Sequence, residues 1–355
     1  MSSKSYKVRT AVLFVLCVLG MALYVYLVSH SPVGSDNIVM EFIAAPRQQN
    51  STIPETRLPQ DNHNCSLVNK MDLCSCRKIT QVTNCTFQMN KISETSTCSS
   101  WAKLRGPGQK VVSYSLFGKF PSSYSFEMEQ QLQRVSEVYP GWVVRLYLDL
   151  SQQQQKPWAC ALACKHPHLD ICDVHDLPGL GDVSNTVGTA WRFSVVGDPF
   201  VERYIVRDTD SPIIQREVDA VHQWIQSGKC FHVMRDNPSH GVPMLGGTWG
   251  GCNTWQTDKA SKIRTNILND PRNNKNYYDQ PILWKHMWPW AKTNMIVHDS
   301  YTCMKFQGSL PFPSPSPHIT FIGMRTYRDK YKNDGIRKPC PVQCRPPDHQ
   351  DWKYC

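Results

Sequence analysis

The strongest constraint on the fold is an alternation of short apolar runs with segments of helical character between residues 110 and 300. Runs rich in β-branched and aromatic residues predict strands, at residues 111–117, 142–148, 170–175, 203–206, 231–234 and 295–297. Segments with helical signals lie between several of them, at residues 122–139, 189–196, 215–226 and 278–290. This order predicts an α/β fold with a mostly parallel sheet flanked by helices. In such sheets ligands bind beyond the carboxyl ends of the strands.

Composition narrows the class of protein. The chain has 355 residues, of which 41% are hydrophobic and only 19% charged, and this excludes a wholly disordered or coiled-coil protein. The formal charge of +10 is spread along the chain without a basic block, which favours anionic ligands but no nucleic-acid partner. The GxSxG and HExxH motifs are absent from the sequence, so a lipase, protease or zinc hydrolase has no support.

An uncharged stretch at residues 11–28 predicts a membrane anchor at the short end of what spans a bilayer. Lys4, Lys7 and Arg9 precede it, so residues 1–10 are expected in the cytoplasm and the rest across the membrane. A cleaved signal peptide is the alternative, but its apolar region is usually shorter and residues 29–31 form a poor cleavage site. We expect a single-pass type II protein, and the short span favours an early secretory membrane such as the Golgi.

The polar residues 29–105 predict a lumenal stem, followed by a compact domain at 106–310 and a Pro/Cys-rich tail at 311–355. Three glycosylation sequons occur in the stem, at Asn50, Asn64 and Asn84. One of the fifteen cysteines, Cys17, lies in the predicted anchor, which leaves fourteen beyond it. Paired CxxC units are absent, so disulfides rather than zinc are expected, with their connectivity open.

The chemistry centres on a DxD sequence. Asp208 and Asp210 directly follow the apolar run at 203–206, which predicts a turn after a buried strand. Two carboxylates at this spacing can converge on one hard cation such as Mn²⁺ or Mg²⁺. That cation would hold a diphosphate and neutralise its charge as it leaves. Chance alone supplies about one DxD in a chain with this many aspartates, so the position after the strand carries the hypothesis.

The sequence around this motif resembles a known family. The pattern WRF…RDTDS…W…MRDNPSH…GGTWG, continued by DQ at 279–280 and HDS at 298–300, is similar to nucleotide-sugar-dependent glycosyltransferases of the GT-A fold. The resemblance covers roughly residues 110–305. It implies that Asp208 and Asp210 bind the metal and that His298 supplies a third ligand. The alternative for His298 is a hydrogen-bonded histidine at a strand end.

Further roles follow from the same resemblance. Arg192 matches an arginine that helps to hold the donor, although a structural salt bridge is the alternative. Tyr114 and Ser115, near the end of the first strand, match the position that binds the nucleotide base.

The candidate catalytic residues for sugar transfer are Asp279 and Asp236, because an inverting transfer needs a carboxylate base that accepts the proton of the acceptor hydroxyl. Helix capping is the alternative for Asp279, and pairing with a neighbouring arginine is the alternative for Asp236. The segment at 246–251 predicts a flexible loop, in which the amides of Gly246 and Gly247 approach a sugar or phosphate.

Together these features predict a metal-dependent glycosyltransferase of hexosyltransferase type, with a UDP-sugar as the expected donor. The acceptor is expected to be a glycan or glycoconjugate. The rival is a lumenal or cell-surface binding module that keeps the fold without turnover.

Overall fold

The computed structural model describes residues 73–74, 76, 95–119, 123–270, 279–317, 320–325 and 338–355, all within one compact unit at 63–355. Its centre is a seven-stranded sheet of order β3-β2-β1-β4-β6-β5-β7. The strands are β1 (Gln109–Leu116), β2 (Val143–Leu148), β3 (Leu169–Asp173), β4 (Val201–Arg207), β5 (Phe231–Arg235), β6 (Thr248–Cys252) and β7 (Met295–Asp299). Only β6 runs antiparallel to its neighbours within this sheet. The predicted mostly parallel α/β sheet is confirmed.

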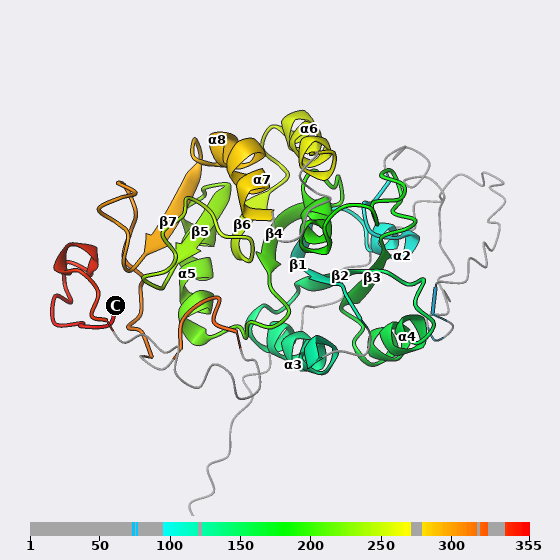
Figure 1. Ribbon diagram of the computed structural model, residues 1–355, viewed down its shortest axis with the longest axis horizontal. Coiled ribbons are helices and arrows are strands. Elements are labelled where there is room, and N and C mark those ends of the chain that lie inside the picture. Colours follow the sequence, from blue (N-terminus) through cyan, green and yellow to red (C-terminus); the bar gives the residue numbers. More distant parts are fainter. Residues whose placement is uncertain are drawn as a thin grey trace, which may run out of the picture. The chain divides into compact units, whose positions relative to one another are not determined.

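Helices cover both faces of the sheet (Figure 1). One face carries α3 (Ser123–Val138), α4 (Gln155–Lys165) and α5 (Gln215–Gln226). The other carries the 3₁₀ helix η2 (Gly188–Val195), α6 (Thr257–Leu268), α7 (Asp279–His286) and α8 (Trp288–Ala291). The short helices α2 (Ser100–Leu104) and η4 (Val342–Cys344) complete the described elements. The two faces bury separate hydrophobic clusters, so side chains that alternate along one strand contribute to different layers.

Helix α5 shows how the sequence sets this packing. Val218, Val221 and Trp224 recur at a spacing of three residues, so they share one face of the helix, and all three are buried. The Trp224 ring stacks on His232 of β5 with centroids 5.3 Å apart. Burial of one such apolar side chain stabilises the fold by about 1.5–3 kcal/mol. The amphipathic pattern therefore fixes which face of α5 meets the sheet.

The glycine-rich segment at 246–251 is not the flexible loop that the sequence predicted, because residues from Thr248 onward form the central strand β6. A Cβ atom on Gly250 would lie 2.7 Å from the Tyr204 carbonyl oxygen, and one on Gly251 would lie 2.5 Å from the Tyr204 hydroxyl. Glycine is therefore required where β6 crosses large aromatic side chains. Trp249 is fully buried and its ring contacts Phe193 and Tyr204, so its role is packing.

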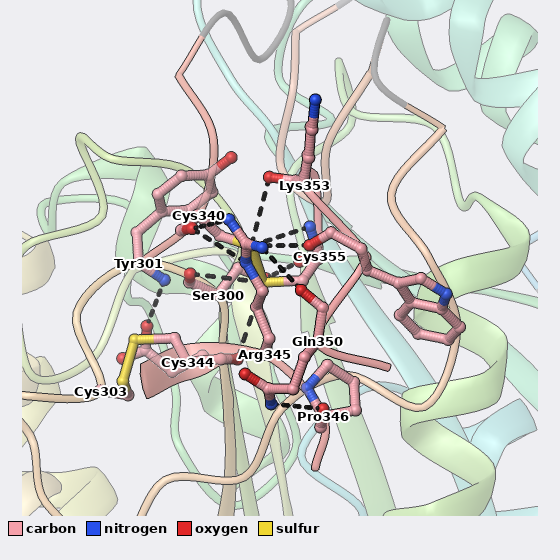
Figure 2. The surroundings of a disulfide bond; sticks show 12 residues. Ser300, Tyr301, Cys303, Cys340, Cys344, Arg345, Pro346, Gln350, Lys353 and Cys355 are labelled. Carbon is pink, nitrogen blue, oxygen red and sulfur yellow. Dashed lines mark hydrogen bonds between the residues drawn. A yellow bond between two sulfur atoms is a disulfide. The ribbon is translucent and has the colours of Figure 1, made fainter. Parts of the chain in front are cut away.

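Six disulfides link the twelve described cysteines beyond the predicted anchor, as the sequence predicted. They are Cys74–Cys160, Cys76–Cys164, Cys98–Cys172, Cys230–Cys252, Cys303–Cys344 and Cys340–Cys355. The first three join residues that the sequence assigned to the stem to α4 and β3. Cys303–Cys344 joins the chain segment at 338–355 to the turn after β7, and Cys340–Cys355 closes a loop within that segment (Figure 2). Expression of residues from 106 onward alone would leave three cysteines of the domain without their partners.

The predicted anchor at 11–28 and the three sequons lie outside the described residues. Within the described ranges, none of the helices has both the length and the apolar character needed to cross a membrane.

Candidate functional site

The two aspartates of the DxD sequence lie on the turn that follows β4. Strands β1, β4, β5 and β7 run in one direction, so their carboxyl ends meet at the same edge of the sheet. Asp208 keeps 35% of its side chain exposed, whereas the side chain of Asp210 is 10% exposed. The turn therefore presents one partly accessible carboxylate at the edge where ligands bind in α/β sheets.

Arg192 joins Asp208 to the predicted sugar-directed residue Asp279. Its Nη1 atom donates to Asp208 Oδ1 at 2.5 Å, and its Nη2 atom donates to Asp279 Oδ2 at 2.9 Å. The η2 backbone that carries Arg192 is held by β1, since Ser113 Oγ donates to the Arg192 carbonyl oxygen at 2.7 Å. One buried guanidinium thus fixes two carboxylates from β4 and α7, which are 71 residues apart in the chain.

Gly246 and Gly247 pack directly against this cluster. A Cβ atom on Gly246 would lie 2.3 Å from Asp279 Oδ2, and one on Gly247 would lie 2.1 Å from Asp208 Oδ2. Distances this short exclude any side chain at either position without movement of a carboxylate. The sequence predicted that these two glycines approach a ligand, and the described structure brings them against the two acids instead.

Burial and mutual charge shape the acidity of the cluster. Burial acts to raise the pKa of Asp208, but the neighbouring Arg192 outweighs it, and the pKa of Asp208 lies below its ordinary value. Burial raises the pKa of Asp210, and the charge of Asp208 raises it further. Burial likewise raises the pKa of Asp279. The repulsion between Asp208 and Asp210 is what a bound cation would relieve.

The carboxylate oxygens of this cluster suit a hard divalent cation that takes only a few of its ligands from the protein. Asp208 and Asp210 offer carboxylate oxygens, and Mg²⁺ is commonly held by one or two carboxylates together with substrate phosphates. Among the residues that the structure describes, His, Cys, Asp and Glu side chains do not form a group of three suited to a metal. The two aspartates would therefore need oxygen atoms from a ligand or water to complete a metal site.

The structure does not bring His298 to the two aspartates. His298 lies on the face of β7 that meets α5, where its Nε2 atom is 2.7 Å from Gln223 Oε1. Its Nδ1 atom is 2.7 Å from His232 Nε2, so both ring nitrogens have partners within the fold. Asp208 instead faces η2 and α7 on the other side of the sheet. The assignment of His298 as a third metal ligand gains no support from this geometry.

Asp236 lies at the same sheet edge but belongs to a closed network. Arg216 of α5 donates to Asp236 Oδ1 through Nε at 3.1 Å and Nη2 at 3.0 Å, and Ser300 Oγ donates to the same oxygen at 3.0 Å. The Ile322 amide donates to Asp236 Oδ2 at 3.0 Å. Arg216 and Ser300 both donate to the Cys355 carbonyl oxygen as well, so this network ties Ile322 and Cys355 to the sheet.

Tyr114 and Ser115 point to opposite faces of β1. Tyr114 is fully buried in the cluster under α3 and α5, and burial raises the pKa of its hydroxyl well above the ordinary value. Ser115 is buried on the face of β1 that carries η2, which is the face of Arg192. Alternation along the strand therefore separates the two residues, and a role in base binding stays a prediction for both.

Arg325 is a site residue that the sequence did not indicate. Its Nε atom lies 3.5 Å from Asp210 Oδ2, although it belongs to the range assigned to the tail. Phe312 and Ile322 are buried nearby in a cluster with Ala220 and Met234, which anchors this part of the tail on α5 and β5. Only the tertiary fold brings a residue 115 positions away to the DxD turn.

Comparison with known proteins finds solved structures that resemble this chain at low identity. The chain matches none of the protein-family models and none of the curated proteins. Among solved structures, a glycosyltransferase involved in the glycosylation of the major capsid of PBCV-1 shares 13% identity over 55% of this chain and 83% of its own, with a TM-score of 0.33. These values concern the fold and assign no activity to this chain.

Two further solved structures show likeness of the same order. The 4-diphosphocytidyl-2C-methyl-D-erythritol synthase from Anaerococcus prevotii has 11% identity over 55% of this chain and 89% of its own, with a TM-score of 0.34. A mannosyltransferase from Pyrobaculum calidifontis, in complex with GDP-Man and Mn²⁺, has 14% identity over 46% of this chain and 52% of its own, with a TM-score of 0.28. Two of these three similar structures are glycosyltransferases by description.

Proposed function

We propose that this chain is a glycosyltransferase that moves a sugar from a nucleotide-diphosphate sugar to a glycan or glycoconjugate acceptor. The observation that carries the proposal is the cluster in which Arg192 holds Asp208 and Asp279 at the carboxyl edge of the sheet. The donor is a UDP-sugar and the transfer is of the hexosyl type. The catalytic domain faces the lumen of the Golgi, with residues 11–28 as its membrane anchor.

The chemistry of the cluster suits a leaving diphosphate. Asp208 and Asp210 would hold Mn²⁺ or Mg²⁺, and the cation would supply charge stabilisation to the departing diphosphate, worth several kcal/mol. Arg192 orients Asp208 through its 2.5 Å hydrogen bond. The acid is thus held in one position while 35% of its side chain stays exposed to a ligand.

Asp279 is the group proposed to act on the acceptor in an inverting transfer. Its raised pKa, caused first by burial, makes it a better proton acceptor than an exposed aspartate. The hydrogen bond from Arg192 Nη2 occupies Oδ2 and orients the carboxyl group. Asp279 Oδ1 would then take the proton from the acceptor hydroxyl as the new glycosidic bond forms. Asp236 is less suited to accept this proton, because both of its carboxylate oxygens already accept hydrogen bonds within the fold.

The second candidate is a non-catalytic binding module on the same fold. Arg192 favours it, since the guanidinium already neutralises much of the charge on Asp208 and Asp279 without a cation. A binding module would keep ligand affinity when divalent ions are removed. A transferase of the proposed type would lose donor cleavage under the same conditions.

A donor panel separates the two candidates. The chain should be secreted from residue 29 onward, so that Cys74, Cys76 and Cys98 can form their disulfides. Release of UDP from several UDP-sugars is then measured with Mn²⁺, with Mg²⁺ and with a chelator. We expect release from at least one donor that stops with the chelator and returns with added metal. Donor binding without metal-dependent release from any of these UDP-sugars would favour the binding module.

A further inference from the structure

A cavity lies at the opposite edge of the sheet from the Asp208 cluster. It has a volume of about 680 Å³. Its walls come from Gly108 before β1, Val201 at the start of β4, Asn253 after β6 and the first turns of α6. These positions are at the amino ends of the parallel strands, so the cavity is separate from the edge that carries the proposed transferase site.

Arg264 of α6 lines this cavity, and its guanidinium is only partly satisfied by the described residues. Arg264 is only 9% exposed, and its Nη1 atom donates to the Val196 carbonyl oxygen at 2.8 Å. Its Nε atom is buried, and no described residue accepts a hydrogen bond from it. Among the described residues no carboxylate forms an ion pair with Arg264, and Asp198 acts on it only at longer range. A buried guanidinium in this state favours an anionic partner supplied from outside.

Asp198 is the acid of the cavity floor, and it is already engaged. Arg145 Nη1 donates to Asp198 Oδ2 at 2.6 Å, and the Thr97 amide donates to the same oxygen at 2.6 Å. The other oxygen accepts from the Phe200 amide at 2.8 Å. Asp198 therefore pairs directly with Arg145, and its charge also acts on Arg264, although the two do not form a direct ion pair.

Helix α6 adds a second attraction for an anion. It has twelve residues, and Thr257, Asp258 and Ser261 from its first turns line the cavity. Gln256 at its N-cap makes no side-chain hydrogen bond to the first-turn amides. The amides of Lys259 and Ala260 donate to the Gln256 carbonyl oxygen, so those of Thr257 and Asp258 are left for a ligand. Together with the positive end of the helix dipole they favour a carboxylate or phosphate.

The rim has a different character from the floor. Glu202 and the exposed Asp258 stand there, and the hydroxyl groups of Thr254 and Thr257 lie beside them. Two carboxylates repel a ligand that carries negative charge throughout, but they accept hydrogen bonds from sugar hydroxyls. The cavity thus combines one cationic end with one hydroxyl-binding end.

We propose that this cavity binds a carboxylate-bearing monosaccharide, such as a hexuronic acid unit of a glycan. The sugar carboxylate pairs with Arg264 and the first-turn amides of α6, while the sugar hydroxyls donate to Glu202 and Asp258. This is a binding site without chemistry, and it does not depend on the transferase assignment.

Direct binding tests this site with the secreted chain from residue 29 onward. Calorimetry with glucuronate is the measurement, with glucose and inorganic phosphate as separate probes. Glucuronate should bind more tightly than either, because glucose lacks the carboxylate and phosphate lacks the hydroxyl pattern. Equal affinity for phosphate would replace the proposal by a simple anion site. Equal affinity for glucose, or absence of glucuronate binding, would overturn it.

Variants locate the binding. Arg264→Gln should weaken glucuronate binding by about tenfold or more, the value of one charge-assisted contact. Lys262→Gln removes an exposed cation from the same helix and should leave the affinity unchanged. Thr257→Trp fills the mouth from an exposed position, and it should block binding even if Arg264→Gln fails to fold. Asp210→Asn should bind glucuronate as the parent does. Loss of glucuronate binding in Asp210→Asn would overturn the proposal and assign the binding to the DxD turn.

Discussion

Two acidic clusters lie at the carboxyl edge of the same sheet, and they differ in what their carboxylates contact. In the first, Asp208 and Asp279 share Arg192, and Asp208 keeps a third of its surface exposed. In the second, Asp236 is fully buried and accepts from Arg216, Ser300 and the Ile322 amide. Residue type and position in the sequence do not distinguish a carboxylate that can meet a ligand from one that holds the fold together. The number of hydrogen bonds and ion pairs that the carboxylate makes within the fold distinguishes the two.

The largest expected effect comes from breaking the second cluster. Asp236→Ala leaves the buried guanidinium of Arg216 without its counter-charge, which typically costs about 3–5 kcal/mol. The free energy of unfolding, measured with urea on secreted protein, should fall by this amount, or secretion should fail. Asp279→Ala is the matched control, because Arg192 keeps its bond to Asp208 and the loss should be smaller. Equal losses in the two variants would contradict the distinction between the clusters.

A methyl group placed against the first cluster should have the next largest effect. Gly247→Ala would set a Cβ atom 2.1 Å from Asp208 Oδ2, and overpacking of this kind typically costs about 1–3 kcal/mol. Because the carboxylate must move, metal-dependent donor hydrolysis should fall by about tenfold or more. Gly241→Ala is the control, since a Cβ atom there has no described atom within 4 Å. If both variants hydrolyse the donor equally well, Gly247 does not restrain Asp208.

The histidine pair on the α5 face should make the fold sensitive to acid. Burial lowers the pKa of His298 to about 3 from an ordinary value of 6.5, so His298 stays neutral in the folded chain. Below pH 6.5 the unfolded chain takes up a proton that the folded chain does not. The contribution of His298 to the free energy of unfolding is therefore complete above pH 6.5. It falls as the pH drops toward 3, by up to about 1.4 kcal/mol per pH unit.

Urea unfolding at pH 7.5 and pH 5.0 measures this effect. The parent should lose more stability between the two pH values than His298→Gln does. The exposed His222 supplies the control, and His222→Gln should keep the parental difference. If His298→Gln also keeps the parental difference, the titration belongs to other groups.

The smallest expected effect concerns the exposed contact between the tail and the DxD turn. Arg325 is 64% exposed and lies 3.5 Å from Asp210, so Arg325→Ala should change the free energy of unfolding by less than about 0.5 kcal/mol. Arg216 of α5 belongs to the buried network that holds the same tail. Arg216→Ala should therefore lower the free energy of unfolding several times more. A thermal unfolding series on both variants makes the comparison. A large loss from Arg325→Ala would mean that the segment at 320–325 is held by this contact.

The sequence predicted much of the sheet because apolar runs of β-branched residues carry a local signal. Six of the seven strands fall at predicted runs. Strand β6 was missed because Gly250 and Gly251 lower its strand propensity, and their close contacts with Tyr204, Trp224 and Phe231 explain them. Helices α4 and α6 were also missed. In α6 the buried positions Ala260, Ile263 and Ile267 recur at helical spacing among many polar residues.

The candidate site was predicted in part. A local motif predicted the turn that carries Asp208 and Asp210. The structure adds that Arg192 donates hydrogen bonds to both Asp208 and Asp279. The face of the sheet to which His298 points depends on register, and the sequence alone did not fix it. The closed network of Asp236 and the approach of Arg325 depend on the course of the tail. Contacts between distant segments are set by tertiary packing, which local patterns do not encode.

The central claim is that the carboxylates after β4 serve catalysis and not folding. Its most direct test is the rate of Mn²⁺-dependent UDP-sugar hydrolysis by Asp210→Asn relative to the parent, with Asp176→Asn as an exposed control on the turn after β3. The account predicts that Asp210→Asn is secreted normally and loses activity by about a hundredfold or more, because charge stabilisation of several kcal/mol is removed. Asp176→Asn should match the parent. A well-secreted Asp210→Asn with parental hydrolysis would contradict the claim.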